Sequence, residues 1–204
     1  MKRRNFICSG IMGGATAAAL PIYGTSLINQ DGSSKPFYVA PRAPLTPGPG
    51  STDVRTIIQS HQTNKQFSNI EVAVSPKQMG PSPHIHADLD ELMYVIEGTA
   101  TVLIGTEVYE IQSGAWNFRP RGIVHSFWNA HDTPLRFIDC FFNQNFEDYL
   151  DQLFHKIIPE MASKKLTPAA LEIKKQIDAL DKKFGITWFH NQRQAIVDKY
   201  RLNG

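Results

Sequence analysis

The sequence predicts a mainly β protein with a helical C-terminal extension. Short strand-like segments follow one another between residues 54 and 142, separated by Gly, Pro, Asn and Asp, which is typical of a β-sandwich or barrel. No helix-length periodic run interrupts them, so a βαβ fold is disfavoured. From Asn145 to residue 204 the spacing of apolar residues changes to that of amphipathic helices.

Eight strands are expected in the β part, residues 54–144. In chain order they cover residues 54–59, 67–74, 92–96, 99–104, 107–111, 115–118, 125–128 and 135–142. Gly98 and Gly105 mark turns between neighbouring segments. A chain of 204 residues with 42% hydrophobic content is long enough for one such domain with appendages.

Two helices are expected in the C-terminal extension. Asn145 can cap the first, and Pro159 is expected to end or kink it. The second is expected to begin at Thr167-Pro168 and to stop at Gly185. The remaining tail, which includes Trp188, is expected to pack back on the domain or to help another subunit. We expect a structural role for the whole extension.

The first 30 residues resemble an export signal. Arg3-Arg4 is followed by a mildly apolar region and by small residues at Ala17 and Ala19, which predicts a twin-arginine signal and a periplasmic protein. The apolar region is too weak to span a membrane stably. Removal of the three basic residues at positions 2–4 lowers the formal charge from +2 to −1. That balance argues against nucleic acid as the main partner.

Residues 31–53 are rich in Pro and Gly and have the composition of an extended arm. Of the two cysteines, Cys8 lies inside the predicted signal, so a mature chain would keep Cys140 alone and form no internal disulfide. Cys140 lies in an apolar strand-like segment, where a thiol is more often part of the core than a nucleophile.

Two stretches of the β part carry potential metal ligands. His84 and His86 are two residues apart, so on a strand they point to the same side. Glu91 follows shortly after, and His125 lies in a later segment. Three imidazoles and one carboxylate suit a divalent transition metal (Fe, Mn, Ni, Co, Cu or Zn) better than Ca or Mg. A closed structural zinc site would more often use cysteines.

Both stretches resemble the signatures of the cupin superfamily. The first reads His84-x-His86-x4-Glu91-x6-Gly98, and the second reads Gly114-x5-Pro120-x-Gly122-x2-His125-x3-Asn129. The fifteen residues between the two motifs are similar to the compact bacterial form. One departure is visible, because three residues lie between Gly80 and His84 where the family pattern has five. We expect the prolines at 81 and 83 to take over the turn there.

The resemblance implies a conical, double-stranded β-helix, a jelly-roll-like barrel, over roughly residues 67–142. It also implies that His84, His86, Glu91 and His125 bind one metal ion at the centre of the barrel. The C-terminal extension looks like that of single-domain, quercetin 2,3-dioxygenase-like cupins. Many cupins are dimers, so a homodimer is expected as well.

Further residues near the motifs have expected positions. Alternate positions of barrel strands line the interior, so we expect a substrate pocket lined by Met93, Tyr94, Trp116, Phe118 and Phe127. Two arginines at 119 and 121 bracket a proline on a turn and are expected to be solvated. Acids at 88 and 90 are expected in a loop or at the surface, and so are the histidines at 61, 131, 155 and 190.

The leading hypothesis for function is a metal-dependent dioxygenase, similar to quercetin 2,3-dioxygenase. Its substrate would be a flavonol, another enol or a catechol-like small molecule, with Glu91 as a metal ligand and candidate base. A metal-dependent isomerase or lyase is the first alternative. The second is a small-molecule-binding protein without catalysis, because fold and ligands do not determine the reaction.

Overall fold

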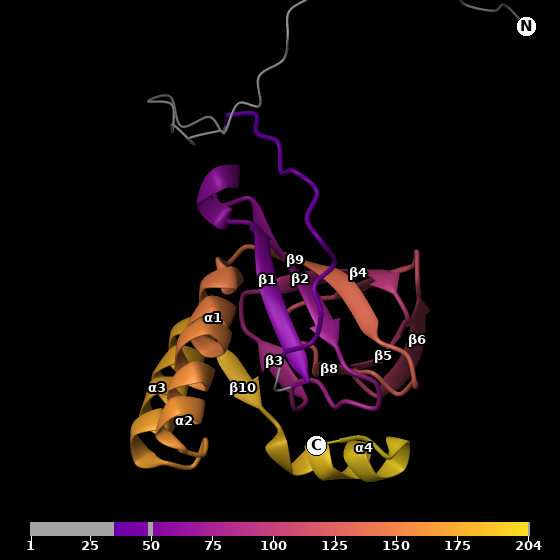
Figure 1. Ribbon diagram of the computed structural model, residues 1–204, viewed down its shortest axis with the longest axis vertical. Helices are drawn as coiled ribbons and strands as arrows, with labels where there is room; N and C mark the ends of the chain where they lie inside the picture. Colours follow the sequence, from indigo (N-terminus) through magenta and orange to yellow (C-terminus); the bar gives the residue numbers. More distant parts are fainter. Residues whose placement is uncertain (1–34, 49–50, 204) are drawn as a thin grey trace, which may run out of the picture.

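The computed structural model describes residues 35–48 and 51–203 (Figure 1). The predicted export signal at residues 1–30, including Cys8, lies outside the described residues. Residues 35–48 contain neither helix nor strand. Two hydrogen bonds attach this arm to the β part, from Leu45 N to Glu71 Oε1 at 3.1 Å and from Arg55 Nη2 to Ala43 O at 2.9 Å.

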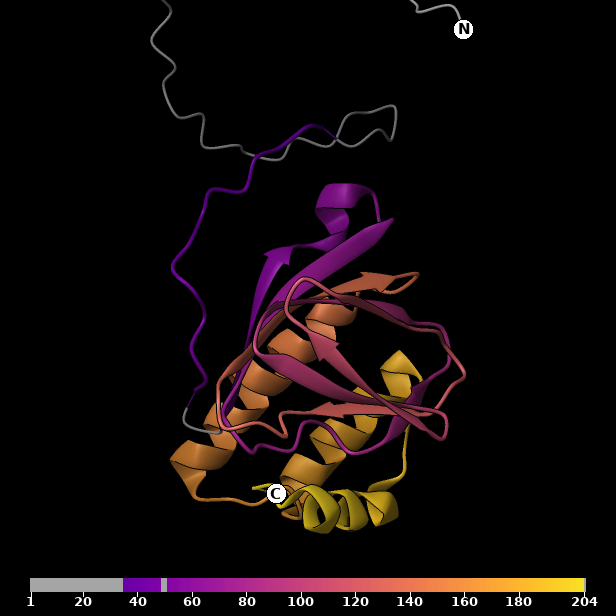
Figure 2. The ribbon, with the colours of Figure 1, turned by 90° about the vertical axis from the view of Figure 1, so that its right-hand side faces the viewer.

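The β part consists of two five-stranded antiparallel sheets that face each other (Figures 1 and 2). The strand order is β1-β2-β9-β4-β7 in one sheet and β10-β3-β8-β5-β6 in the other. The strands are β1 Thr52–Ile58, β2 Phe67–Val74, β3 His84–His86, β4 Asp90–Glu97, β5 Thr99–Ile104, β6 Glu107–Gln112, β7 Trp116–Arg119, β8 His125–Trp128, β9 Leu135–Phe142 and β10 Ile186–Trp188. The predicted mainly β fold is confirmed.

The main core lies between the two sheets. Every second residue of β9 is buried from Leu135 onwards, as the period of 2 in a strand requires. Met93 of β4 and Phe137 of β9 are fully buried there. Side chains of the C-terminal extension, among them Phe146 and Phe184, belong to the same cluster. The extension therefore completes the core of the β part.

Gly98 makes the tight turn between β4 and β5. Its φ of 78° lies in the left-handed region, which disfavours residues with a side chain. A Cβ atom at this position would also lie 2.4 Å from the carbonyl oxygen of Pro134. Both observations explain why the sequence places a glycine here.

The first helical segment is longer than predicted. Helix α1, Phe146–Gln152, continues through a π-helical turn, Leu153–Ile157, into α2, Ile158–Lys164. Pro159 does not end it, because the proline lies directly after the π-helical turn, where the α-helical bonding pattern is already interrupted. Asn145 occupies the N-cap position as predicted, but its side chain bonds Asp148 instead of capping the backbone.

The second predicted helix begins later than expected. Helix α3 spans Leu171–Phe184, and Thr167 instead lies in a turn in which its carbonyl accepts a bond from Ala170 N–H. Gly185, with φ 65°, ends the helix as predicted. Two short 3₁₀ turns, Ser60–Thr63 and His190–Gln192, and the final helix α4, Arg193–Tyr200, complete the elements. In the described part of the chain no helix is both long and apolar enough to span a membrane.

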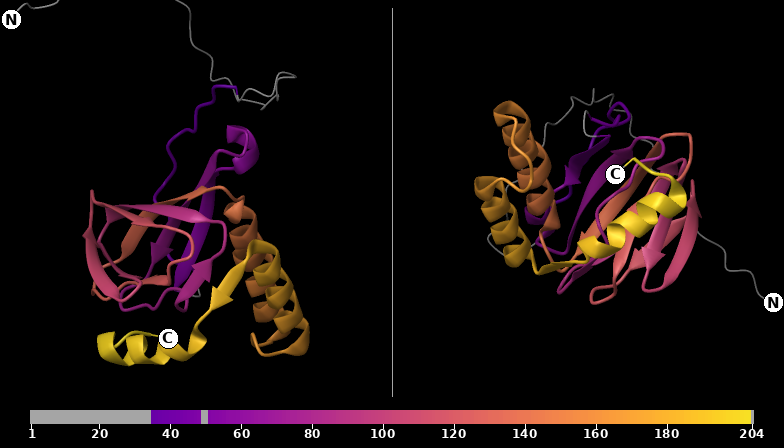
Figure 3. Two further views of the ribbon diagram at one scale, coloured as in Figure 1. Left: turned by 180° about the vertical axis from the view of Figure 1, so that it is seen from behind. Right: turned by 90° about the horizontal axis from the view of Figure 1, so that it is seen from below.

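The tail after Gly185 contributes a strand that the sequence did not reveal. β10 pairs with β3, and α4 then lies across one end of the β part, while α1, α2 and α3 stand beside it (Figures 1 and 3). Tyr200 of α4 packs on Trp128, with ring centroids 4.9 Å apart. The extension thus reaches the sheet that carries the histidine pair.

Candidate metal centre

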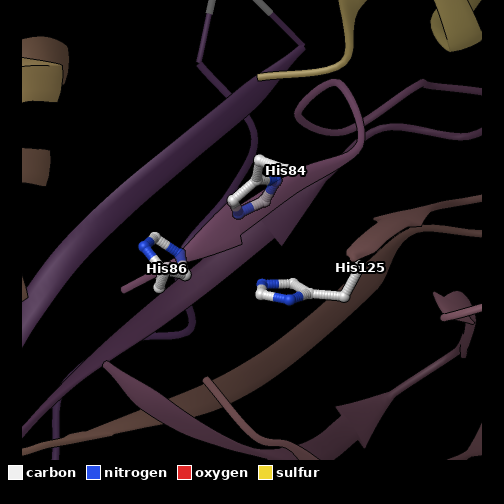
Figure 4. Close-up of side chains that lie close together, drawn as sticks. All are labelled: His84, His86 and His125. Atoms are coloured by element: carbon white, nitrogen blue, oxygen red, sulfur yellow. The ribbon is translucent and has the colours of Figure 1, made fainter. Parts of the chain in front are cut away.

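Three histidines converge between the sheets. His84 and His86 lie on the same face of β3, and His125 of β8 is the direct cross-strand partner of His84. Figure 4 shows the three imidazole rings directed toward one another. Within the described ranges they form one group whose candidate ligand nitrogens all lie within 4.8 Å of one another. Each of these side chains is at most 6% exposed.

Two of the rings are held in the tautomer that a metal requires. The Nδ1 atom of His84 lies 2.8 Å from the carbonyl oxygen of Ser82, and that of His125 lies 2.9 Å from the carbonyl oxygen of Ile123. A carbonyl oxygen only accepts, so in both rings Nδ1 carries the hydrogen. The lone pair then lies on Nε2, where it is available to a metal ion.

The third ring has no hydrogen-bond partner in the described part of the chain. Neither nitrogen of His86 is bonded, and Nε2 of His125 is unpartnered as well, although both residues are fully buried. Leaving a buried polar atom unpaired costs about 1–3 kcal/mol. A divalent ion would satisfy these nitrogens, so the donor set fits the predicted metal.

Glu91 joins the histidines from β4. Its Oε2 atom lies 3.1 Å from Nε2 of His125, and its Oε1 atom lies 3.4 Å from Nε2 of His86. The residue is 5% exposed. The fold therefore brings all four predicted ligands together, with the three imidazoles as the compact group and the carboxylate beside two of them.

Arg119 is a member of this site that sequence reasoning missed. It was expected to be solvated, but it is 1% exposed, with Nε 3.0 Å from Glu91 Oε2 and Nη2 2.6 Å from Asp139 Oδ1. The register pairs Glu91 directly with Arg119. The sequence offered no usable signal, because the expected interior position of Phe118 puts residue 119 on the outer face by alternation, and only the pairing with β4 reverses the two.

Burial and charge set the protonation of the site. Burial, reinforced by His125 and His86, holds the pKa of His84 well below 6.5, so the ring is neutral near pH 7. Burial alone would raise the pKa of Glu91, but the Arg119 guanidinium, the largest opposing charge, helps to hold that pKa well below its usual value. Burial raises the pKa of Asp139 to about 7, against the opposing pull of Arg119. A neutral His84 and an ionised Glu91 are in the forms that bind metals.

The five predicted pocket residues divide into two groups. Met93 is fully buried in the core, and Phe127 lies inside as well, where it packs on Phe137 with ring centroids 5.0 Å apart. The interior position expected for the other three is wrong: Tyr94, Trp116 and Phe118 lie on the outer face of their sheet. These three residues occupy the alternate positions to Glu91 and Arg119, and a one-residue offset in a strand reverses the face.

The other polar residues near the motifs lie as expected. Asp90 accepts hydrogen bonds from the backbone and side chain of the exposed Arg121, which joins the start of β4 to the turn before β8. His131 pairs with Glu110, and His155 pairs with Asp151, both at the surface. None of these groups belongs to the buried histidine cluster.

Residues 70–141 match the family model described as a cupin domain. The match includes all four candidate ligands and covers about a third of the chain. Together with the two facing antiparallel sheets, it shows the cupin fold implied by the two sequence motifs. The helical extension lies outside the matched segment. No curated protein matches the sequence.

Several solved structures resemble parts of the chain. TT1209 from Thermus thermophilus is 23% identical, with 48% of this chain and 88% of that chain covered and a TM-score of 0.43. KdgF from Halomonas sp. is 17% identical, with 48% of this chain and 84% of that chain covered and a TM-score of 0.43. The polyketide cyclase RemF from Streptomyces resistomycificus is 27% identical, with 46% of this chain and 66% of that chain covered and a TM-score of 0.41. Similarity at this level transfers no function.

Proposed function

We propose that this protein is a metal-dependent dioxygenase that acts on an enol or catechol-like small molecule, with flavonols as the first class to test. The observation that carries the proposal is the convergence of three buried imidazoles, two of them with unpartnered nitrogens, beside an ionised carboxylate. The choice of reaction rests on the resemblance of the motifs and the extension to quercetin 2,3-dioxygenase-like cupins.

His84, His86, His125 and Glu91 would hold the ion. A redox-active divalent metal, when bound, would supply Lewis acidity and the electron chemistry that dioxygen incorporation needs. The chain itself contributes a buried site, since each of these residues is at most 6% exposed. Exclusion of water protects reactive species and strengthens the electrostatic interactions inside the site.

Arg119 would act on the site through Glu91. Its guanidinium keeps the carboxylate ionised and orients it, while Asp139 holds the guanidinium from the other side. An ionised Glu91 supports its role as a ligand. Its low pKa also makes it a weak base, so its role in taking a proton from a substrate hydroxyl stays a prediction.

The proposal can be tested by oxygen uptake. The protein is stripped of metal, reconstituted separately with Mn, Fe, Co, Ni or Cu, and mixed with a flavonol or a catechol. We expect dioxygen consumption with at least one ion, and none with a His125→Ala variant treated in the same way. Absence of uptake with every ion, in protein shown to contain metal, would reject the dioxygenase.

The same experiment separates the alternatives. Conversion of a substrate under argon would favour an isomerase or lyase, in which the ion polarises a carbonyl or carboxylate. Tight binding of an unchanged molecule would favour a binding protein. The periplasmic location and the homodimer are further parts of the proposal, which cell fractionation and sedimentation would test.

A further inference from the structure

The C-terminal extension forms one wall of the histidine cluster. β10 is the edge strand next to β3, with Ile186 opposite His86 and Trp188 opposite His84. Flanking backbone bonds run from Ala87 N to Gly185 O at 3.0 Å and from Phe189 N to Pro83 O at 2.8 Å. The strand that carries two candidate ligands is therefore fixed on one side by the tail.

Aromatic side chains of the extension touch both of these ligands. The rings of Trp188 and His84 have centroids 4.8 Å apart at an interplanar angle of 39°. Phe146 of α1 meets His86 edge to face, also at 4.8 Å. Since no hydrogen bond orients the ring of His86, packing of this kind sets its direction.

One carboxylate connects the two aromatic contacts. Asp181 of α3 accepts a hydrogen bond from Trp188 Nε1 through Oδ2 and another from the Tyr149 hydroxyl through Oδ1, each at 2.8 Å. Tyr149 stacks on Phe146, with ring centroids 4.8 Å apart and an interplanar angle of 8°. A continuous chain of contacts thus runs from one histidine of β3, through the extension, to the other.

The tail also holds the loop that precedes β3. Arg193 Nη1 donates to the carbonyl oxygen of Gly80 at 2.7 Å, and His190 Nδ1 lies 3.0 Å from Ser82 Oγ. The carbonyl of Ser82 is the group that orients His84. This loop is also where the spacing before the histidine pair departs from the cupin pattern.

We propose that Asp181 and Trp188 are positioning residues for the metal centre, and that docking of the extension and metal binding stabilise each other. The inference rests on the proposed metal site. Metal ligands bind their ion more weakly when the residues that orient them are removed. For residues that hydrogen-bond a ligand directly, the loss in affinity is about 10- to 100-fold. Coupling of this kind is reciprocal, so the ion must also stabilise the docked tail.

The first test measures Co²⁺ affinity in the full-length protein by competition with a chelator. Asp181→Asn leaves one oxygen to serve two donors, and Trp188→Phe keeps a ring beside His84 but loses the N–H. We expect a loss of up to about 10-fold in affinity for both variants, at the lower end of the effect of removing a hydrogen bond made directly to a ligand. The matched control is Asp178→Asn, on the same helix, whose exposed side chain pairs with Lys174 and should leave affinity unchanged.

The second test separates positioning from a general loss of stability. The visible absorption spectrum of the Co²⁺-saturated protein reports ligand geometry, so it should shift in Trp188→Phe and stay unchanged in Asp178→Asn. In the unmutated protein, Co²⁺ should slow hydrogen exchange of the amide of Phe189, which bonds across to Pro83.

The outcomes distinguish the inference from its premise. If the unmutated protein binds no Co²⁺, the metal site itself is rejected. If it binds Co²⁺ while both variants keep its affinity and spectrum, or if Co²⁺ leaves exchange in the tail unchanged, the positioning role is rejected. Trp188→Phe keeps a ring at its position, so its affinity and spectrum test the positioning role even if Asp181→Asn does not fold.

Discussion

Arg119 and Glu91 face each other directly across β7 and β4, with the guanidinium Nε 3.0 Å from the carboxylate Oε2. Both side chains are buried. Asp139 also pairs with Arg119, so two carboxylates flank one guanidinium. Removing one member of a buried ion pair leaves an uncompensated charge, which costs more than the pair contributes. The candidate metal site therefore shares Glu91 with a buried ion-pair network of the core.

Arg119→Met should destabilise the protein by about 3–5 kcal/mol, because it leaves Glu91 and Asp139 buried without their cation. The measurement is the free energy of unfolding in urea. Arg121→Met is the control, since that exposed arginine pairs with Asp90 at the surface and its loss should cost much less stability. Equal losses in the two variants would contradict the buried role of Arg119.

His86→Ala should abolish metal binding, whereas His131→Ala, at the surface beside Glu110, should not. Elemental analysis of the purified proteins measures this. A ligand that binds only the folded state also raises the melting temperature. Added metal should therefore stabilise the unmutated protein and the His131 variant, and not the His86 variant. Stabilisation of all three alike would place the ion elsewhere.

Glu91→Gln should separate the two roles of this residue. If Glu91 takes a proton from the substrate, turnover should fall by about 10²–10⁴-fold, the usual contribution of a general base, in protein that still holds metal through three histidines. The rate at saturating substrate and the metal content are measured on the same sample. If the rate falls only in proportion to the metal content, Glu91 is a metal ligand and does not act as a base.

Trp116→Ser and Phe118→Ser should change stability by about 0.5 kcal/mol or less, because both side chains are more than half exposed on the outer face. Metal content and turnover should stay unchanged. Phe137→Ala, in the core between the sheets, should cost about 3–5 kcal/mol. A specific loss of substrate affinity in the Trp116 variant would restore the pocket position expected from sequence.

Cys140 should react slowly with iodoacetamide near pH 8. Burial, with the nearby Asp139, raises the pKa of its thiol to about 11, and only the thiolate reacts. Peptide mass spectrometry would follow the residue, with urea-unfolded protein as the control. Between pH 9 and 11 the unfolded state loses this proton first, so the group lowers stability as pH rises through that window. Fast modification of the folded protein at pH 8 would contradict this.

The local features of the site could be read from sequence. His84 and His86 share a face because a strand repeats every two residues, and Gly98 is required by a turn of positive φ. The same rule could not place Arg119, because its buried face follows from the pairing of β7 with β4. The expected pocket failed for Tyr94 because the identity of an aromatic side chain does not say which face of its strand is buried.

By itself, the sequence determined the mainly β fold, eight of the ten strands in the described residues, and the four candidate ligands, because these depend on short-range periodicity and fixed spacing. Only the tertiary structure decided that Asp139 neutralises Arg119 and that β10 pairs with β3. It alone placed Trp188 against His84, 104 positions away along the chain. Contacts between distant segments arise from packing of the whole core. The residue pattern within one segment does not specify which other segment packs against it.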